Sequence, residues 1–522
     1  MNRAAMYRRL RHTPFWDMIV VGGGATGVGV AVDASSRGYT VLLLEQSDFG
    51  KGTSSRSTKL VHGGVRYLEQ GNISLVMEAL EERGLLAQNA PHLVRNLGFV
   101  VPNYEWWETP FYGIGLKLYN LLAGKFGFGP SRILSPGETL RFLPNIETTG
   151  LRGGVIYFDG QFDDARLLIN LAATAHEHGA VLLNYVAVTG LARDAEGFVN
   201  GVRARDTETG EEFSVSAKVV INATGPFTDA LRRLADSTVQ PIISPSQGVH
   251  LVFDGSLLAS ESAIMLPRTS DRRVLFAIPW HGHTLVGTTD TPGVEPSLEP
   301  VPMEQEIAFI LETAARYLTP KPSRADILSM FAGIRPLVRG DGSANTAALS
   351  RGHTVRIENS GLVTLCGGKW TTYRRMAEDC VNQAATLAGL PERECVTRNL
   401  PIHGSLAAGS PGGARSGWMD VYGSDAAAIA RLAEEDASLQ NRLHAQLPYI
   451  AAEVVWAVRE EMALTVEDVL ARRTRALFLN ARAALEMAPA VADLMMRELG
   501  RNETWRDSQL RAFAATARNY RT

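Results

Sequence analysis

The hexapeptide GGGATG, at residues 22–27, restricts the fold more than any other part of the sequence. It follows a short apolar run at residues 17–21. It also opens a stretch of small residues, 25–37, that has helical character and stops at Gly38. A second apolar run, TVLLLE, follows at residues 40–45. Strand, tight turn, helix and strand predict a β–α–β unit, whose strands lie parallel in one sheet.

The glycines of this turn predict a dinucleotide site. Gly22, Gly24 and Gly27 match the pattern G-x-G-x-x-G, and the acidic Glu45 ends the next predicted strand. Glycines permit a tight turn and a close approach of pyrophosphate to the backbone, and the helix N-terminus offers free N–H groups. The carboxylate of Glu45 can accept hydrogen bonds from ribose. A glycine-rich turn in an ordinary α/β fold does not account for turn, helix and acid in this order.

Two later segments favour FAD over NAD. A predicted strand ends in NATG at residues 222–225, and CGGKWTT at 366–372 again combines a strand, a glycine turn and a helix start. A helix N-terminus there can stabilise the reduced flavin ring. The sequence has no second glycine cradle for a nicotinamide. Its three cysteines form no CxxC pair, which argues against a redox disulfide or a zinc ribbon, and no metal site is predicted.

Length and composition indicate a soluble protein of several domains. A chain of 522 residues is too long for one ordinary core, and its net charge of −3 gives no indication of a nucleic-acid partner. The N-terminus is basic but lacks the apolar stretch of a secretory signal. No run of eighteen uncharged apolar residues predicts a membrane span.

Three further regions have distinct patterns. Residues 241–291 alternate strand-like runs with turn residues, which predicts an antiparallel sheet in a second domain. Residues 404–417 are a low-complexity linker, and 418–520 are strongly helical, with Thr465 to Asp468 (TVED) as a predicted capping box. Three arginines of this tail, at positions 472, 473 and 475, indicate either a solvated helix face or an interdomain contact.

Seven segments together closely resemble the FAD-dependent, quinone-linked glycerol-3-phosphate dehydrogenases. They are GGGATGVGVAVDASSRG, SSRSTKLVHGGVRYLE, DDARL, NATGPF, PWHGHTLVGTTDT, GIRPL and CGGKWTTYRRMAED. The likeness covers residues 15–400, and the helical tail is similar to the family's C-terminal cap. It implies an α/β fold plus an all-α tail: a glutathione-reductase-type FAD-binding Rossmann domain, an antiparallel-sheet substrate domain and a C-terminal helical cap domain.

The resemblance also implies domain boundaries. The FAD-binding domain is expected to be discontinuous, at residues 15–90, 151–240 and 330–395. The substrate-binding domain is expected at residues 91–150 and 241–329. The C-terminal helical domain is expected at residues 396–522.

The implied reaction is oxidation of sn-glycerol 3-phosphate at C2 to dihydroxyacetone phosphate, with hydride transfer to FAD. By resemblance, Arg66, Tyr67, Arg335 and Lys369 bind the substrate. His250 is the predicted base, because imidazole accepts protons near neutral pH, and Arg335 would stabilise the developing alkoxide. Alternatively, Arg335 or Lys369 handles the proton. A lone histidine in a strand is more often a hydrogen-bonded structural residue.

The resemblance implies a larger set of cofactor-binding residues. They are Gly22, Gly24, Gly27, Glu45, Ser54, Ser55, Lys59, His62, Val186, Thr224, Gly225, Gly368, Thr371 and Thr372. Asp163 and Asp164 are interpreted as a helix cap rather than as a catalytic carboxylate pair. Arg56 has no assigned role, and Asp290 is interpreted as a turn residue.

Electrons would pass to a membrane quinone, ubiquinone or menaquinone, and the protein would attach peripherally to the inner face of the cytoplasmic membrane. An aromatic and basic patch would contact lipid: Trp106, Trp107, Phe111, Tyr112, Lys117 and Lys125. Packing of residues 111–128 inside the substrate domain is the other interpretation, and a homodimer is a candidate assembly. Alternative functions are an oxygen-using glycerol-3-phosphate oxidase, an amine or amino-acid flavin oxidase, and a non-enzymatic flavin-bearing redox sensor or scaffold.

Overall fold

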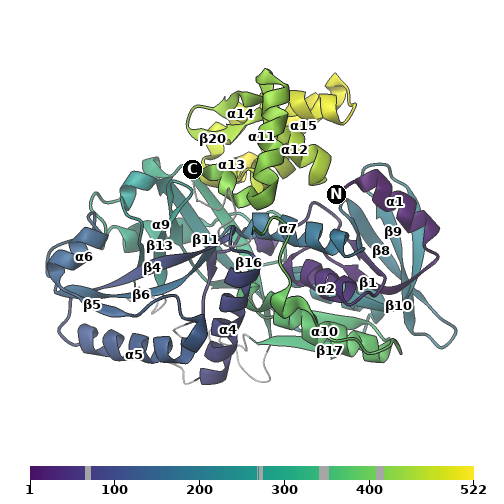
Figure 1. The fold of residues 1–522 in the computed structure, drawn as a ribbon, viewed down its shortest axis with the longest axis horizontal. Coiled ribbons are helices and arrows are strands. Elements are labelled where there is room, and N and C mark those ends of the chain that lie inside the picture. The colour runs from purple at the N-terminus through teal and green to yellow at the C-terminus, as the bar shows by residue number, and fades with distance from the viewer. Residues whose placement is uncertain (65–71, 267–268, 270–273, 340–351, 407–416) are drawn as a thin grey trace.

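A computed structural model describes residues 1–64, 72–266, 269, 274–339, 352–406 and 417–522. Two large sheets lie next to each other, and the C-terminal helices, in green and yellow, sit above both (Figure 1). The predicted architecture, an FAD-binding α/β fold with an all-α tail, is confirmed. No helix among the described residues combines the length and the apolar character needed to cross a membrane.

The first sheet contains the predicted β–α–β unit. Its strands are β1 (Phe15–Val21), β2 (Val41–Leu44), β7 (Val181–Leu183), β8 (Val186–Arg193), β9 (Val199–Asp206), β10 (Glu212–Asn222), β17 (His353–Ile357) and β18 (Val363–Gly367). The order β18-β10-β1-β2-β7 is parallel throughout, and β17, β8 and β9 add antiparallel pairs. All four residues of β2 are buried, as expected for a central parallel strand covered on both faces.

Helices cover this sheet: α1 (Arg3–His12), α2 (Ala25–Ser36), α7 (Asp164–Glu177), α8 (Thr228–Ala235) and α10 (Tyr373–Leu387). Small residues let α2 approach its neighbours closely. A Cβ at Gly29 would lie 2.9 Å from the ring of Tyr373, the first residue of α10. The glycine therefore allows the helix after the first turn to pack against the helix after the late glycine turn.

The second sheet is mostly antiparallel. Its strands are β3 (Leu60–Val61), β4 (Val94–Asn103), β5 (Arg132–Leu134), β6 (Gly153–Phe162), β11 (Ile243–Asp254), β12 (Ala263–Leu266), β13 (Leu275–Trp280), β14 (His283–Gly287), β15 (Thr291–Pro292) and β16 (Ser329–Val338). Strands β11, β14, β13 and β12 are consecutive neighbours in antiparallel register, in agreement with the sheet predicted for residues 241–291.

Two predicted domain boundaries need correction. Strand β6 begins at Gly153 and β16 at Ser329, and the predicted boundaries at 151 and 330 place almost all their residues in the FAD-binding domain. Both strands instead belong to the second sheet, where β6 pairs with β4 and β16 pairs with β11 along their whole lengths. An apolar strand buried on both faces carries no pattern that identifies its partner, so the sequence did not distinguish the two sheets.

Helices flank the second sheet: α4 (Ile73–Asn89), α5 (Glu108–Ala123), α6 (Pro136–Phe142) and α9 (Glu304–Ala314). The C-terminal domain consists of α11 (Ala426–Glu435), a hairpin of β19 (Arg442–His444) and β20 (Leu447–Ile450), α12 (Ala451–Glu460), a π-helix (Asp468–Arg473), α13 (Ala476–Leu479), α14 (Ala481–Glu498) and α15 (Glu503–Ala517). The predicted capping box is present. Thr465 Oγ1 accepts from the Asp468 amide at 3.2 Å, and Asp468 Oδ2 accepts from the Thr465 amide at 3.0 Å. Most of the predicted linker, 407–416, lies outside the described residues.

Candidate functional site

A cavity of about 860 Å³ is lined by both sheets. The first sheet contributes the turn between β1 and α2, the loop after β2, the end of β10 and the turn before α10. The second sheet contributes side chains of β11, β16 and the loops at residues 288–290 and 296–298. A glycine-rich turn, polar loop residues and charged side chains therefore meet in one space large enough for a dinucleotide.

The β1–α2 turn has the geometry of a phosphate cradle. Gly22 has φ +113°, and a Cβ there would lie 2.6 Å from the carbonyl oxygen of Ala223. A Cβ at Gly27 would lie 1.9 Å from the carbonyl oxygen of Gly22. Gly24 is the N-cap of α2, so the first turn of this helix, whose amides have no partner within the helix, begins in the cavity lining. Only glycines fit this close backbone arrangement, and the arrangement fits a pyrophosphate group.

Glu45 is placed for a double role. Its Oε2 accepts from the amide of Gly23 at 2.6 Å, and its Oε1 accepts from the amide of Ser47 at 2.8 Å. Burial raises the pKa of this carboxyl, and the two backbone donors act in the opposite direction. Each carboxylate oxygen has a further lone pair, so Glu45 stabilises the turn and can still accept from a ribose hydroxyl.

Two loops that line the cavity are joined by side-chain hydrogen bonds. Ser54 Oγ accepts from the amide of Ala25, in the first turn of α2, at 2.9 Å. The indole of Trp370 donates to the carbonyl oxygen of Ser54 at 2.9 Å, and Thr371 Oγ1 accepts from the amide of His62 at 3.3 Å. The glycine turn of residues 22–27 and the turn before α10 are thus part of one hydrogen-bonded wall.

His250, on β11, is a buried imidazole in the cavity lining. Its Nε2 lies 2.9 Å from Thr58 Oγ1, and its ring stacks on Phe331 with centroids 4.9 Å apart. Burial, followed by the positive charges of Lys59 and Arg335, holds the pKa of this imidazole well below its usual value. The ring is therefore neutral at physiological pH and can accept a proton.

Arg335 is on β16, and its guanidinium lies beside Gly248 of the neighbouring strand β11. A Cβ at Gly248 would be 2.4 Å from Nη2 of Arg335, so glycine leaves the space that the guanidinium occupies. Nη2 donates to Thr288 Oγ1 at 3.1 Å and to the carbonyl oxygen of Thr289 at 3.0 Å, and Nη1 lies 3.4 Å from Asp290 Oδ1. The side chain keeps 29% of its surface exposed in the cavity lining. The result is an oriented cation beside a neutral imidazole.

Comparison with known proteins identifies the family. A model of FAD-dependent oxidoreductases matches residues 17–374, and one of the C-terminal domain of alpha-glycerophosphate oxidase matches residues 363–506. The chain is 41% identical to the mitochondrial glycerol-3-phosphate dehydrogenase of Rattus norvegicus, over 98% of this chain and 74% of that protein. It is 42% identical to the mitochondrial glycerol-3-phosphate dehydrogenase of Arabidopsis thaliana, over 92% of this chain and 82% of the relative. The chain belongs to the FAD-dependent glycerol-3-phosphate dehydrogenases.

A solved structure supports the same conclusion. The glycerol-3-phosphate dehydrogenase of Bacillus halodurans, solved with FAD, superposes with a TM-score of 0.81 at 30% identity, over 99% of this chain and 97% of that one. FAD is the cofactor of this dehydrogenase chain. The glycine turn, with no room for a Cβ at Gly22 or Gly27, fits this dinucleotide.

The cavity brings together most residues predicted for a dehydrogenase of this family. Its lining includes Gly22, Gly24, Glu45, Ser54, His62, Val186, Thr224, Gly225, His250, Arg335, Gly368, Lys369 and Thr371. Gly27, Ser55, Lys59 and Thr372 are absent from this lining. Gly27 acts through the close packing described above. Arg66 and Tyr67 lie outside the described residues.

Lys59 faces the protein interior, not the cavity that would hold FAD. Its Nζ lies 2.7 Å from Asp164 Oδ2 and donates to the carbonyl oxygen of Ser55 at 2.7 Å. Burial lowers the pKa of Lys59 to about 7, although the Asp164 carboxylate opposes the shift. Asp163 is the N-cap of α7 and accepts from the amide of Arg166, as predicted, while Asp164 is the ion-pair partner that the sequence did not reveal.

Other contributors to the site were missed. Thr58 contacts His250 and lies within the polar stretch 53–59, whose many hydroxyls were the available signal. Asp290, interpreted as a turn residue, lies beside Arg335 and accepts a hydrogen bond from Ser246 Oγ. Nothing in the local sequence indicates that these side chains converge, because Thr58 and Asp290 lie in loops that meet β11 and β16 only in the folded protein.

Proposed function

We propose that this chain oxidises sn-glycerol 3-phosphate at C2 to dihydroxyacetone phosphate and that the electrons pass to a membrane quinone. The main support is the juxtaposition of Arg335 and His250 in the cavity that contains the glycine cradle. Arg335 presents an oriented guanidinium, and His250 presents a neutral imidazole. These are the two groups needed to stabilise an alkoxide and to take up the hydroxyl proton.

When bound, FAD supplies the hydride acceptor. The protein handles the proton and the charge. The neutral imidazole of His250 has one nitrogen without hydrogen, and this atom accepts the proton of the C2 hydroxyl. Thr58 Oγ1, 2.9 Å from Nε2, helps to fix which nitrogen that is. Arg335 is held by Thr288 and Thr289, so it can meet developing negative charge with little reorganisation.

The cations of the cavity favour a phosphorylated polyol over an amino acid. Arg335 and Lys369 both line the cavity, and Lys369 precedes the first helical turn that leads into α10. With Arg335 assigned to the developing alkoxide, Lys369 adds a second positive charge to the cavity, and a cavity with this net positive charge suits a dianionic phosphate better than a single carboxylate. This argument, together with the family relationship, favours glycerol 3-phosphate over the substrates of amine and amino-acid oxidases.

An anaerobic titration tests the proposal. Glycerol 3-phosphate is expected to bleach the absorbance of the bound flavin, and an added short-chain quinone is expected to restore it faster than air does. An unchanged flavin spectrum would contradict the proposed substrate. Equal recovery with air and quinone would instead favour the oxidase alternative for the electron acceptor. Glycerol, which lacks the phosphate, is the matched control.

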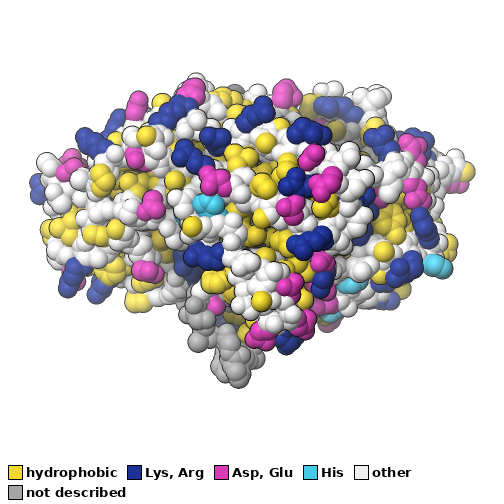
Figure 2. Space-filling view, turned by 90° about the horizontal axis from the view of Figure 1, so that it is seen from above, with side chains coloured by type: hydrophobic (Ala, Val, Ile, Leu, Met, Phe, Trp, Pro, Cys, Tyr) yellow, Lys and Arg dark blue, Asp and Glu magenta, His cyan; other side chains and the backbone are white. Residues whose placement is uncertain are grey.

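The exposed side of α5 supports peripheral membrane attachment. Ile114 and Leu121 are 72% and 77% exposed, and Phe111 and Leu118 on the same helix are also exposed. The other side of α5 is buried, which agrees with packing of part of this segment inside the substrate domain, whereas contact of the exposed side with lipid stays a prediction. The face seen from above in Figure 2, on the side away from α5, shows basic and acidic side chains interspersed with hydrophobic ones. We therefore propose that the α5 face rests on lipid, at the inner face of the cytoplasmic membrane.

Replacing Ile114 and Leu121 by Asp is expected to weaken vesicle binding by at least about tenfold, because two apolar side chains are lost from the lipid contact. Co-sedimentation with anionic phospholipid vesicles at low salt measures this. Leu387→Asp, at an exposed apolar residue of α10, is the control and should bind as the parent does. Equal binding of all variants would contradict the α5 assignment. A homodimer stays a prediction, which light scattering can test.

A further inference from the structure

The loop after β2 forms one side of the FAD cavity. Residues from Gln46 to Thr58 contribute most of this wall, including the short helix Thr53–Ser55. Glu45 precedes the loop and Lys59 ends it, so the loop connects the predicted ribose contact to the polar stretch beside His250. The loop also contacts the C-terminal helical domain, and these contacts take no part in the chemistry proposed above.

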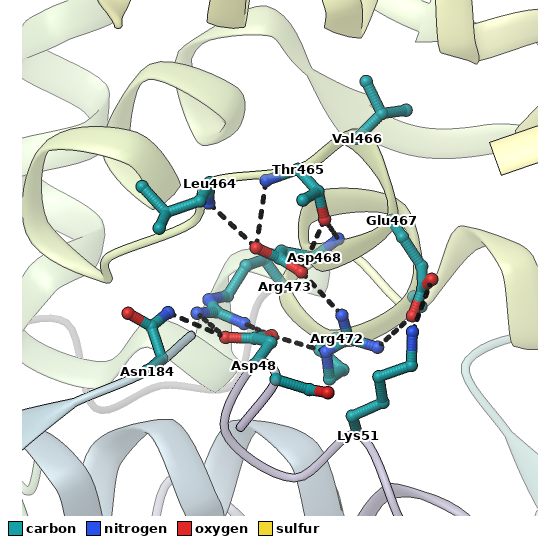
Figure 3. Close-up of polar contacts among 12 residues, drawn as sticks. Asp48, Lys51, Asn184, Leu464, Thr465, Val466, Glu467, Asp468, Arg472 and Arg473 are labelled. Carbon is teal, nitrogen blue, oxygen red and sulfur yellow. Dashed lines mark hydrogen bonds and ion pairs between the residues drawn. The ribbon is translucent and has the colours of Figure 1, made fainter. Parts of the chain in front are cut away.

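Asp48 is the main contact between the loop and that domain (Figure 3). It is fully buried and accepts from Arg473 Nη1 at 2.7 Å, from Arg473 Nη2 at 3.0 Å and from Arg472 Nε. Burial alone would raise the pKa of Asp48, but Arg473 and Arg472 outweigh it and lower the pKa to about 2. The carboxylate is therefore charged at all physiological pH values, and in the part of the chain that the structure describes its two ion-pair partners, Arg472 and Arg473, both belong to the C-terminal domain.

The π-helix Asp468–Arg473 makes this grip possible. Consecutive residues of an α-helix point in directions about 100° apart, yet Arg472 and Arg473 both reach Asp48 from this wider turn. Arg475 follows with φ +65°, and its Nη2 donates to the carbonyl oxygen of Ser55 at 2.9 Å. Three arginines of one short segment therefore bind the loop at two residues, Asp48 and Ser55.

Two more contacts continue along the loop. Lys51 Nζ lies 2.9 Å from Glu467 Oε2, which precedes the π-helix. Arg56 lies over the rings of Phe478 and Tyr520, at 5.8 and 5.7 Å from their centroids. Loop positions 48, 51, 55 and 56 are therefore each held from the C-terminal side, and two of them, Lys51 and Arg56, also line the cavity next to residues 52–54.

We infer that the C-terminal helical domain is a positioning element for FAD: its segment 467–475 holds the loop 46–58 in the shape that retains the cofactor. Docking of the domain and retention of FAD are then coupled, and the coupling is reciprocal, so bound FAD also stabilises docking. Arg473 acts through Asp48 and is a positioning residue. The inference rests on FAD binding alone and stands whether or not glycerol 3-phosphate is the substrate.

Flavin release from the full-length holoenzyme tests the coupling. Because flavin fluorescence rises on release, dilution of Arg473→Met into buffer measures the rate directly. We expect release about 5- to 150-fold faster than from the parent protein. Glu467→Gln, which removes a partner of both Lys51 and Arg472, is a milder second variant and should change release in the same direction.

Arg166→Met is the matched control. Arg166, on α7, makes a buried ion pair across the same domain interface, 2.6 Å from Glu461, and does not contact the loop; its one link to the tested contact is Glu461, whose carboxylate lies 3.7 Å from Arg473 Nε. It should lose comparable thermal stability and release FAD at the parent rate. Faster amide hydrogen exchange of residues 46–58 in Arg473→Met, but not in Arg166→Met, would support the inference that the C-terminal domain holds this loop. The inference would be overturned if Arg473→Met and Glu467→Gln both released FAD at the rate of the parent protein. It would also be overturned if Arg166→Met released FAD as fast as Arg473→Met does.

Discussion

Replacement of His250 by Asn is expected to lower kcat for glycerol 3-phosphate oxidation by about 10²- to 10⁴-fold, the usual contribution of a general base. Asn is smaller than imidazole but still polar, so it can keep a hydrogen bond to Thr58. It cannot accept a proton at neutral pH. The flavin should stay bound, because the His250 side chain contacts Thr58 and Phe331, and neither residue belongs to the glycine cradle.

Stopped-flow measurement of flavin reduction isolates this step from later electron transfer. His283→Asn is the matched control: His283 lies on β14, the antiparallel neighbour of β11, and opposite Asp254 rather than His250. Its reduction rate should equal that of the parent protein. Parental reduction by His250→Asn with full flavin content would return His250 to the structural role that a lone strand histidine usually has.

The pH dependence of flavin reduction also tests the role of His250 as the base. Burial and the charges of Lys59 and Arg335 lower the pKa of His250, so the active, neutral imidazole predominates both at and well below pH 6.5. The rate of flavin reduction should therefore fall only as the pH drops far below the usual histidine range. Asn at position 250 should remove this acidic limb. A parent profile that falls with a midpoint near 6.5 would contradict the burial argument.

Local patterns predicted the cofactor cradle better than the substrate side. The turn of residues 22–27, with Glu45 after the next strand, is built by consecutive residues, so its geometry follows from sequence spacing. His250 and Arg335 come from different strands of one sheet, and only the family resemblance brought them together. Their supports are Gly248 on β11 and the loop residues Thr58 and Asp290, which approach them only in the folded protein and were not predicted as such.

Buried charges were the hardest features to predict. The family resemblance places Lys59 at the cofactor, yet its Nζ pairs with Asp164, more than a hundred residues away. Of the two roles considered for Arg472, Arg473 and Arg475, the interdomain contact is correct, since all three are buried at that interface. Sequence shows a cation but not its partner, and burial of a cation is tolerable only where a partner is present.

Replacement of Arg335 by Gln is expected to lower kcat/KM for glycerol 3-phosphate by about 10²- to 10³-fold, the usual loss when one preorganised donor to an oxyanion is removed. The guanidinium is held by Thr288 and Thr289 and lies over Gly248, so its position is fixed before the substrate arrives. Steady-state kinetics with a soluble quinone measure the loss. Arg339→Gln, an exposed arginine just beyond β16, is the control and should retain parental values.

The division between kcat and KM identifies what Arg335 binds. An interaction with the developing alkoxide exists only in the transition state, so its loss lowers kcat and leaves KM almost unchanged. A grip on the phosphate is present throughout, so its loss raises KM instead. Because Arg335 lies close enough to His250 to lower its pKa, we expect the first pattern. Arg335→Lys keeps the charge but loses the planar fork and should recover only part of the activity. If Arg335→Gln had the kcat and KM of the parent protein, Arg335 would have no role in the reaction. The proposed chemistry would then lose its main support, which is the proximity of Arg335 to His250.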